Sequence, residues 1–160
     1  MMDRALLADF CANDQEPRHF LRAPWREDDG RVVATDGRIM IVLDELPGDF
    51  PAPSPSIAKS VAGIALACDK QWVNELGKTW IRVGDLEIPD NTPCTWCDTE
   101  EKPGCFRCYW TGIDTVAMQV GEQPFQARYM NLLKRLPDCE IAVPFDGYVA
   151  GFRFAGGVGY

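Results

Sequence analysis

Four cysteines in the second half of the chain have the spacing of a metal site. They are Cys94, Cys97, Cys105 and Cys108, in the pattern C-x2-C-x7-C-x2-C. Two residues between paired cysteines let both thiolates of a tight turn face one ion. Two such pairs supply four sulfur atoms at tetrahedral positions, the arrangement that zinc prefers. We therefore predict one structural Zn²⁺, held by a zinc knuckle over residues 92–110.

Three other chemistries also use paired cysteines. Two disulfides would need an oxidising compartment, to which nothing in the sequence points. An iron–sulfur cluster also takes four cysteines, and a redox C-x-x-C pair is expected where a helix starts beside a strand, whereas this segment has the composition of a loop. Zinc remains the favoured interpretation. Because four thiolates leave no position for a reactive water, we expect the metal to stabilise the fold and not to catalyse a reaction.

Aromatic residues crowd the cysteine segment, and basic residues lie on a helix predicted further along the chain. The aromatic residues could form a small core for the segment or contact a partner, because aromatic side chains dominate binding hot spots. The basic residues could face a partner or DNA. The candidate partner-binding residues are Trp96, Phe106, Trp110, Arg128, Lys134 and Arg135.

No catalytic set is recognisable in the sequence. The single histidine, His19, is expected to be structural. There is no nucleophile-elbow, P-loop or dinucleotide-binding motif. Acids such as Asp36 and Asp146 precede glycines in predicted turns, where Asp is favoured for backbone reasons. We predict a protein that acts by binding and is not an enzyme.

Length and charge limit the functions and locations that are compatible with the sequence. The chain has 160 residues, with 24 acidic and 16 basic side chains and a net charge of −8. Proteins that wrap nucleic acid are usually basic, so only a local DNA-binding face is compatible with this charge. No apolar run reaches the roughly 18 residues of a membrane helix, and acids interrupt the first ten residues where a secretory signal would be apolar. We expect a soluble, cytoplasmic protein.

Hydrophobic periodicity and turn residues predict an α+β fold. A helix is predicted over residues 2–12 with Asp3 as its cap, followed by strands over 20–27, 31–35 and 38–43. The Asp28-Asp29-Gly30 and Asp36-Gly37 turns should join these strands into hairpins. The four prolines of residues 47–56 indicate a loop. Further elements are predicted as a helix over 57–67, strands over 79–83, 86–88 and 115–120, a helix over 125–136, and strands over 140–143, 148–154 and from 156 onward.

The order of motifs in the first third of the chain resembles a domain of the bacterial DNA polymerase sliding clamp, the beta subunit. Pro17-Arg18-His19-Phe20-Leu21, and then the segment Asp29–Arg38 with Ala34-Thr35-Asp36-Gly37-Arg38 at its end, are similar to that family's strand entry, hairpin and turn. Residues 125–160 look like the second half of such a domain. The resemblance implies a clamp-like α-βββ/α-βββ domain made of residues 1–45 and 121–160. Residues 46–120 would be an insertion with a linker, a helix and the zinc knuckle.

These features together predict a non-enzymatic, zinc-binding interaction protein with a protein partner, linked to DNA replication or to a phage or mobile element. Direct contact with DNA is left open, because a clamp ring needs six such domains and this chain has one. The alternative is an acidic, phage-type inhibitor that occupies the basic nucleic-acid-binding groove of a host defence complex. A metal-dependent hydrolase is a third hypothesis, from the enzyme class.

Overall fold

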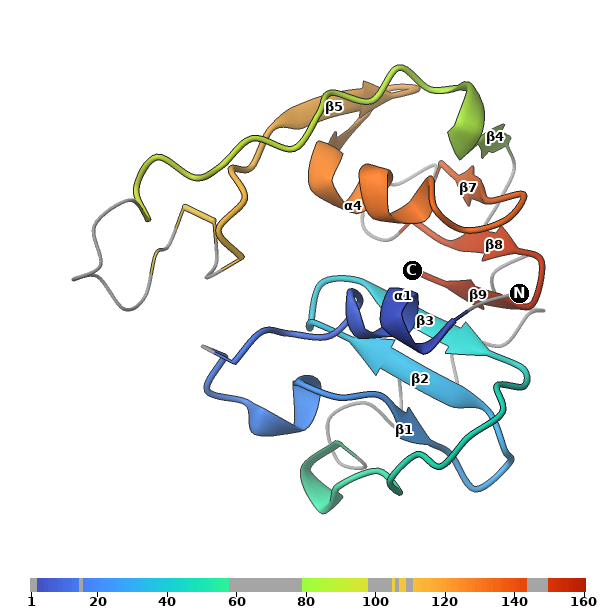
Figure 1. The fold of residues 1–160 in the computed structure, drawn as a ribbon. Coiled ribbons are helices and arrows are strands. Elements are labelled where there is room, and N and C mark those ends of the chain that lie inside the picture. Colours follow the sequence, from blue (N-terminus) through green and yellow to red (C-terminus); the bar gives the residue numbers. More distant parts are fainter. Residues whose placement is uncertain are drawn as a thin grey trace.

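The computed structural model describes residues 3–14, 16–57, 79–97, 105, 107–108, 111–143 and 150–160. Figure 1 shows the arrangement of its helices and strands. In chain order the elements are α1 (Arg4–Ala8), η1 (His19–Leu21), β1 (Trp25–Arg26), β2 (Val32–Thr35), β3 (Met40–Leu43), β4 (Trp80–Arg82), η2 (Val83–Asp85), β5 (Ala117–Val120), β6 (Gln123–Gln126), α4 (Ala127–Leu133), β7 (Glu140–Ala142), β8 (Phe152–Phe154) and β9 (Gly157–Gly159). This composition confirms the predicted α+β class.

A seven-stranded sheet organises the described chain, in the order β1-β2-β3-β9-β8-β7-β4. All neighbouring strands in it are antiparallel. One helix and three strands, α1 with β1–β3, precede a second set of α4 with β7–β9, and the two sets join where β3 pairs with β9. The helices α1 and α4 lie on the same face of the sheet (Figure 1).

The predicted insertion contributes to this sheet. Strand β4, from within residues 46–120, pairs with β7 at the sheet edge, with Ile81 opposite Ile141. Val83, just after β4, is fully buried in the main core, and Met118 and Val120 of the β5–β6 hairpin are buried there too. Among the described residues of 46–120, Val83, Met118 and Val120 therefore share one core with residues of 1–45 and 121–160.

The strand alternation places the core on both faces of the sheet. Val32, Ala34, Ile41 and Leu43 join the cluster beneath α1 and α4, with Phe10 from the turn after α1. The intervening side chains of β2 and β3 face the opposite side and pack with Trp25, Ile57 and Val158. Since successive side chains point to opposite faces of a strand, the uninterrupted apolar run of β3 fits its burial on both sides.

Two glycines of β9 allow aromatic rings to lie directly over the sheet. A Cβ added at Gly159 would overlap the Met40 carbonyl oxygen and the Phe152 ring, and one at Gly157 would overlap the Val42 carbonyl oxygen and the Phe154 ring. Phe152 and Phe154 stack with ring centroids 6.3 Å apart. Only glycine at these positions leaves the strand close enough to β3 for pairing and still leaves room for the rings.

The two predicted hairpins are present, and side chains fix the turn between β2 and β3. Asp36 Oδ1 accepts hydrogen bonds from the backbone N–H of Arg38 at 2.8 Å and of Ile39 at 3.0 Å. The Thr35 hydroxyl donates to the Ile39 carbonyl oxygen at 2.7 Å. Gly37 has φ +91°, which favours glycine. The Thr-Asp-Gly sequence thus determines this turn locally.

Several predicted elements are shorter than the sequence pattern indicated. Asp3 caps α1 through a hydrogen bond from Leu6 N–H at 2.6 Å, but the helix ends at Ala8, not at residue 12. The strand predicted over 20–27 begins only at Trp25, because Pro24 has no N–H for a ladder. Residues 86–88 follow a 3₁₀ turn and form no strand.

The predicted 125–136 helix also differs at its start. Phe125 and Gln126 pair with Met118 and Ala117 in the β5–β6 hairpin, so the helix begins at Ala127. The predicted helix over 57–67 lies, apart from residue 57, outside the described residues, as do the Asp146-Gly147 turn and residues 148–149 of the strand predicted there.

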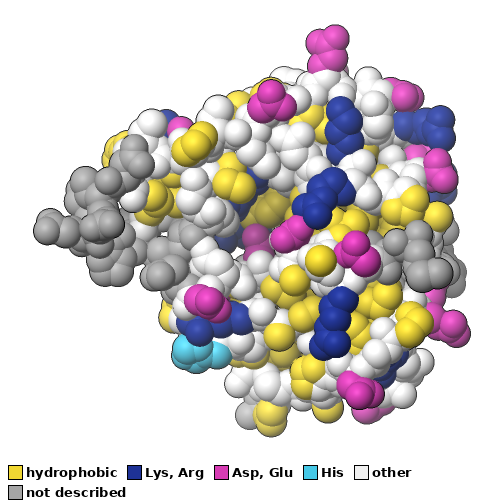
Figure 2. Space-filling model, in the orientation of Figure 1, with side chains coloured by type: hydrophobic (Ala, Val, Ile, Leu, Met, Phe, Trp, Pro, Cys, Tyr) yellow, Lys and Arg dark blue, Asp and Glu magenta, His cyan; other side chains and the backbone are white. Residues whose placement is uncertain are grey.

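Charges of both signs are mixed on the face of the molecule that Figure 2 shows. Neither a continuous acidic surface nor a basic stripe covers that face. Among the described helices, none has the length and apolar character needed to cross a membrane.

Candidate metal centre

Two extended arms bring the cysteine pairs together. Pro93 and Ile113 form an antiparallel bridge. Cys94 N–H donates to the Gly112 carbonyl oxygen at 2.8 Å, and Asp114 N–H donates to the Thr92 carbonyl oxygen at 2.8 Å. In Figure 1 these arms run side by side away from the sheet. The backbone pairing therefore fixes the distance between the two C-x-x-C turns at their base.

All four predicted ligands converge. The sulfur atoms of Cys94, Cys97, Cys105 and Cys108 lie within 4.8 Å of one another. The Cys94 and Cys105 sulfurs are 3.7 Å apart, and those of Cys97 and Cys108 are 3.2 Å apart. A tetrahedral tetrathiolate site with metal–sulfur bonds of about 2.3 Å has sulfur–sulfur edges of about 3.8 Å. The cluster has the donor set and the approximate dimensions to hold one metal ion.

These cysteines are free thiols and not disulfides. Cys94, Cys105 and Cys108 are buried, and Cys97 is half-buried. Hydrogen bonds from the backbone N–H groups of Cys108 and Arg107 lower the pKa of Cys105 to about 7. Burial raises the pKa of Cys94, and a backbone N–H of Trp96 acts against that rise. In each pair the first cysteine thus accepts backbone N–H groups from its own turn, and such hydrogen bonds favour a thiolate. The hydrogen bond with Cys108 and burial instead raise the pKa of Cys97.

The four sulfurs form a closed donor set. Among the described residues, no histidine or carboxylate belongs to the cluster. A tetrahedral site filled by four protein ligands has no open position for substrate or water. The arrangement can therefore stabilise a fold, because metal binding and folding are linked where ligands come together only in the folded chain.

Trp96 is the one large apolar side chain exposed among the residues that the structure describes, with 62% of its surface accessible. It lies in the turn between Cys94 and Cys97, and the Arg107 guanidinium is 5.8 Å from its ring centroid. Arg107 donates two hydrogen bonds to the Asp114 carboxylate, both at 2.8 Å. That pairing lowers the pKa of Asp114. The metal-binding turn therefore carries a tryptophan and an oriented arginine at the surface.

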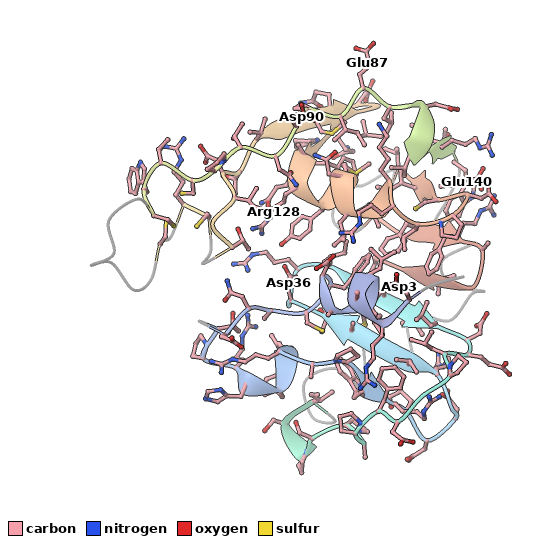
Figure 3. All side chains as sticks on the ribbon, in the orientation of Figure 1. Asp3, Asp36, Glu87, Asp90, Arg128 and Glu140 are labelled. Atoms are coloured by element: carbon pink, nitrogen blue, oxygen red, sulfur yellow. The ribbon has the colours of Figure 1, made fainter. Side chains whose placement is uncertain are left out.

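Arg128, predicted to contact a partner, is instead buried, with 7% of its surface accessible. Its Nη1 donates to the Cys108 carbonyl oxygen at 3.1 Å and to the Thr111 hydroxyl at 2.9 Å, and its Nη2 donates to the Tyr129 hydroxyl at 2.5 Å. Tyr129 in turn donates to Asp36 at 2.9 Å. In Figure 3, Arg128 lies beside α4 and Asp36 lies at the β2–β3 turn. Arg128 therefore links the cysteine segment to the β2–β3 turn, and its side chain is not exposed to a protein partner.

The other predicted basic residues do not form one stripe. Lys134 is exposed at the end of α4. Arg135 is exposed too, but its Nη1 lies 2.6 Å from the Asp9 carboxylate. Phe106 and Trp110 lie outside the described residues, and their roles stay predictions.

Two described cysteines lie outside the cluster, Cys139, which is buried, and Cys11, which is half-buried. Burial raises the pKa of Cys11 and of Cys139 to about 12 each, so both stay protonated and unreactive near neutral pH. Cys68 lies outside the described residues.

The Arg128–Tyr129–Asp36 connection was missed by sequence reasoning. Tyr129 and Asp36 are 93 positions apart, and no local pattern relates them. The same applies to the Arg107–Asp114 pair, whose partners meet only because the two arms pair.

No model of a known protein family matches the sequence, and neither the curated proteins nor the solved structures give a match. The candidate function therefore rests on the geometry of the site alone.

Proposed function

We propose that this chain is a zinc-binding interaction protein, in which a metal-held turn presents Trp96 to a protein partner. Its role is binding and not catalysis. The observation that carries the proposal is the 62% exposure of Trp96 on a turn whose two flanking cysteines belong to the metal cluster.

Zinc is the metal that best suits this cluster. Four thiolates, sulfur separations near those of a tetrahedron and a short loop-rich segment are typical of structural zinc sites. The residues that would hold it are Cys94, Cys97, Cys105 and Cys108. Bound zinc would supply no chemistry here beyond cross-linking the two turns.

The surface around Trp96 has the composition of a binding hot spot. Tryptophan and arginine are the residues most enriched at hot spots, where a rigid aromatic side chain is buried against the partner. Arg107 is held by Asp114 and lies over the Trp96 ring, so both side chains lose little conformational freedom on binding.

A photo-cross-linking amino acid at Thr95, an exposed neighbour of Trp96, tests this proposal in cells that express the protein. We expect a discrete cross-linked partner. With that partner purified, Trp96→Ala should weaken binding about 30-fold, as for a hot spot worth about 2 kcal/mol. Thr95→Ala is the matched control and should bind normally.

Two results would contradict the proposal. One is the absence of any cross-link specific to position 95. The other is normal partner binding by Trp96→Ala. In both cases metal analysis must show that zinc content is unchanged, so that a damaged knuckle is not mistaken for a lost contact.

A second candidate function, linked to DNA replication, is favoured by the topology. The succession of a helix and three antiparallel strands occurs twice, and the two sets join through β3 and β9. This order supports the resemblance to a sliding-clamp domain. The burial of Arg128 and the pairing of Arg135 weigh against a basic lining for DNA. Duplex DNA binding with a steep salt dependence would favour this candidate, and no binding at low salt would exclude direct DNA contact.

A further inference from the structure

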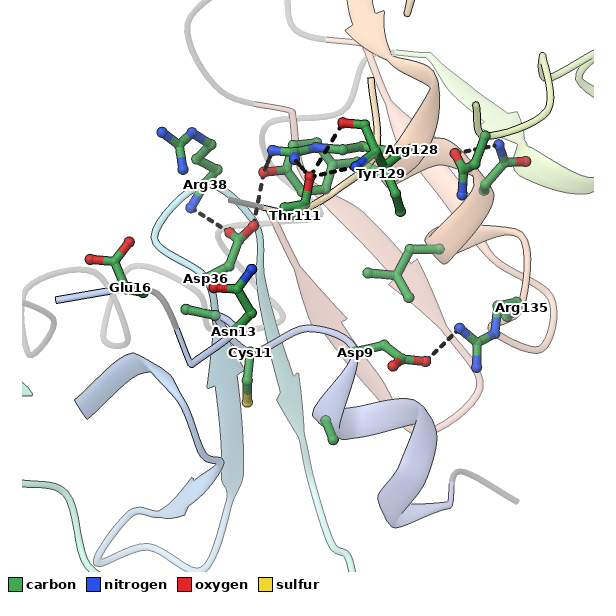
Figure 4. Close-up of a pocket in the computed structure, with 16 residues that line it drawn as sticks. Asp9, Cys11, Asn13, Glu16, Asp36, Arg38, Thr111, Arg128, Tyr129 and Arg135 are labelled. Atoms are coloured by element: carbon green, nitrogen blue, oxygen red, sulfur yellow. Dashed lines mark hydrogen bonds and ion pairs between the residues drawn. The ribbon is translucent and has the colours of Figure 1, made fainter. Parts of the chain in front are cut away.

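A cavity with a mixed polar and apolar lining lies where the residues after α1, the β2–β3 turn, the cysteine segment and α4 meet. Its volume is about 530 Å³, within the range of about 300–1,000 Å³ that is usual for sites of small molecules. Figure 4 shows Asp9 and Asn13 on one side of it, Asp36 at the β2–β3 turn, and Arg128, Tyr129 and Arg135 on α4 and just after it. The cavity is distinct from the metal cluster and from Trp96.

Arg128 is the one buried arginine of the described chain. Buried charges are normally paired with opposite charges, since desolvation of an unpaired ion is costly. Arg128 makes no ion pair with any carboxylate of the described chain, and its three hydrogen bonds all go to neutral oxygen atoms. Six arginines that are more exposed than Arg128 do make ion pairs. These are Arg18 with Glu16, Arg31 with Asp29, Arg82 with Asp138, Arg107 with Asp114, Arg135 with Asp9, and Arg153 with Glu140.

The acids around the cavity do not neutralise Arg128. Asp9 is held by Arg135 at 2.6 Å, and Glu16 by Arg18 at 2.7 Å. Asp36 accepts the Tyr129 hydroxyl and two N–H groups of its own turn. The Asp36 carboxylate is connected to Arg128 only through the Tyr129 hydroxyl. The buried guanidinium therefore has no direct contact with a carboxylate of the described chain.

Arg128 also has donor capacity left. A guanidinium carries five N–H donors, and the hydrogen bonds of Arg128 use three of them. Nε is buried and has no hydrogen-bond partner among the described groups. Two unused N–H donors on one guanidinium can receive two oxygen atoms of a carboxylate or a phosphate.

We propose that this cavity binds a small molecule through a carboxylate or phosphate group that accepts hydrogen bonds from Arg128. The lining is mixed, with side-chain amides from Asn13, Asn91 and Asn131 and apolar side chains such as Ile113 and Leu132, so it suits a ligand that has both a charged group and an apolar part. The ligand's negative charge would compensate the buried guanidinium, and this interaction would be stronger in the cavity than in water because the surroundings are less polarisable.

The metal-binding segment positions this arginine. Both Nη1 hydrogen bonds go to that segment, to the Cys108 carbonyl oxygen and the Thr111 hydroxyl. Loss of the segment's fold would release the guanidinium from its present orientation. Anion affinity should therefore fall when the metal is removed, and by linkage the anion should strengthen metal binding.

Calorimetric titration of the metal-loaded protein with inorganic phosphate and, separately, with succinate tests the proposal. We expect saturable binding of at least one anion at millimolar concentration, and the two probes distinguish phosphate from carboxylate ligands. Arg128→Gln should lose at least about tenfold in affinity, as expected for hydrogen bonds to a charged group. Arg153→Gln, which removes an arginine paired with Glu140, is the matched control and should bind as wild type does.

Because Arg128→Gln could disturb the fold, a second measurement uses the unaltered protein. The Nε–H resonance of Arg128 in a ¹⁵N–¹H spectrum, assigned with Arg128→Lys, should shift on titration with the anion that binds. Absence of both heat and shift with either probe would overturn the proposal, as would anion binding that survives Arg128→Gln. The proposal is also wrong if Arg128→Gln loses metal and neither anion binds the wild-type protein. The guanidinium then acts as a counter-charge to the thiolates, and the cavity does not bind anions.

Discussion

The sheet and the cysteine segment of this protein are stabilised in different ways. The sheet's core combines aliphatic and aromatic side chains from both helices, from β2 and β3, and from β7 and β8. The buried cluster of the described cysteine segment consists of Cys94, Cys105 and Cys108, with Cys97 packed against them. Apolar burial of the first kind stabilises a fold by itself, whereas a cluster of thiols does so mainly through the ion that it binds. We therefore expect the sheet to be stable without a ligand and the cysteine segment to depend on a bound metal.

The junction between the two regions is polar. Arg128 and Tyr129 connect Cys108 and Thr111 of the cysteine segment to Asp36 of the β2–β3 turn. Hydrogen bonds are directional, so this connection orients the segment relative to the sheet with little apolar contact.

Removal of the metal should have the largest effect and should separate the two regions. Structural zinc contributes about 10–16 kcal/mol to the folding of zinc-finger peptides, so chelation or Cys108→Ser should abolish protection from hydrogen exchange at residues 92–97 and 111–114. Amides of β2, β3 and β9 should stay protected. Wild type should contain one zinc per chain by mass spectrometry. Cys139→Ser, which changes a buried cysteine outside the cluster, should keep the metal.

Three results would contradict the prediction about metal removal. Metal-free wild type, or Cys108→Ser with full metal content, would contradict the assignment of the cluster. Equal loss of protection in β2, β3 and β9 would contradict the independence of the sheet.

A packing change in the sheet should have a smaller effect that reaches the whole sheet. Gly159→Ala places a methyl group against the Met40 carbonyl oxygen and the Phe152 ring, and we expect a loss of about 3 kcal/mol in the free energy of unfolding. Gly84→Ala is the control, because no atom lies within 4 Å of its added Cβ, and it should change stability by less than about 0.5 kcal/mol. Urea denaturation measures both. Equal midpoints for the two variants would show that β9 has more room than the structure indicates.

The smallest effect concerns the ion pair between buried Glu16 and half-exposed Arg18. Glu16 is 6% exposed, and a hydrogen bond from Arg18 lowers its pKa. A lowered carboxyl pKa gives stability that is fully present above the unfolded value, about 4.3, and that is lost as pH falls through the folded value. Glu16→Gln should cost about 2 kcal/mol at pH 7, and the difference from wild type should shrink in acid.

The control for this pH dependence is Asp9→Asn, which removes an exposed pair with Arg135 and should cost under about 1 kcal/mol. Since acid also protonates the thiolates and releases metal, each variant is compared with wild type at the same pH. A Glu16→Gln cost that does not change with pH would contradict the electrostatic explanation.

Local features of the fold could be predicted from the sequence because neighbouring residues determine them. The Asp3 cap, the Asp36-Gly37 turn and the buried run of β3 depend on a few consecutive residues, and each is present. Element lengths were less predictable. The strand over 20–27 and the start of the 125–136 helix were misplaced, because Pro24 delays pairing and because Phe125 is used by a hairpin partner.

The candidate site also has some features that the sequence predicts and others that it does not. The sequence by itself determined the four metal ligands, because thiol chemistry and C-x-x-C spacing restrict them before any tertiary contact forms. Only the tertiary structure decided that β4 of the expected insertion completes the sheet, that Arg128 is buried, and that it meets Tyr129 and Asp36 beside a cavity. Those outcomes depend on which apolar faces pack together, and packing joins residues whose separation along the chain carries no local signal.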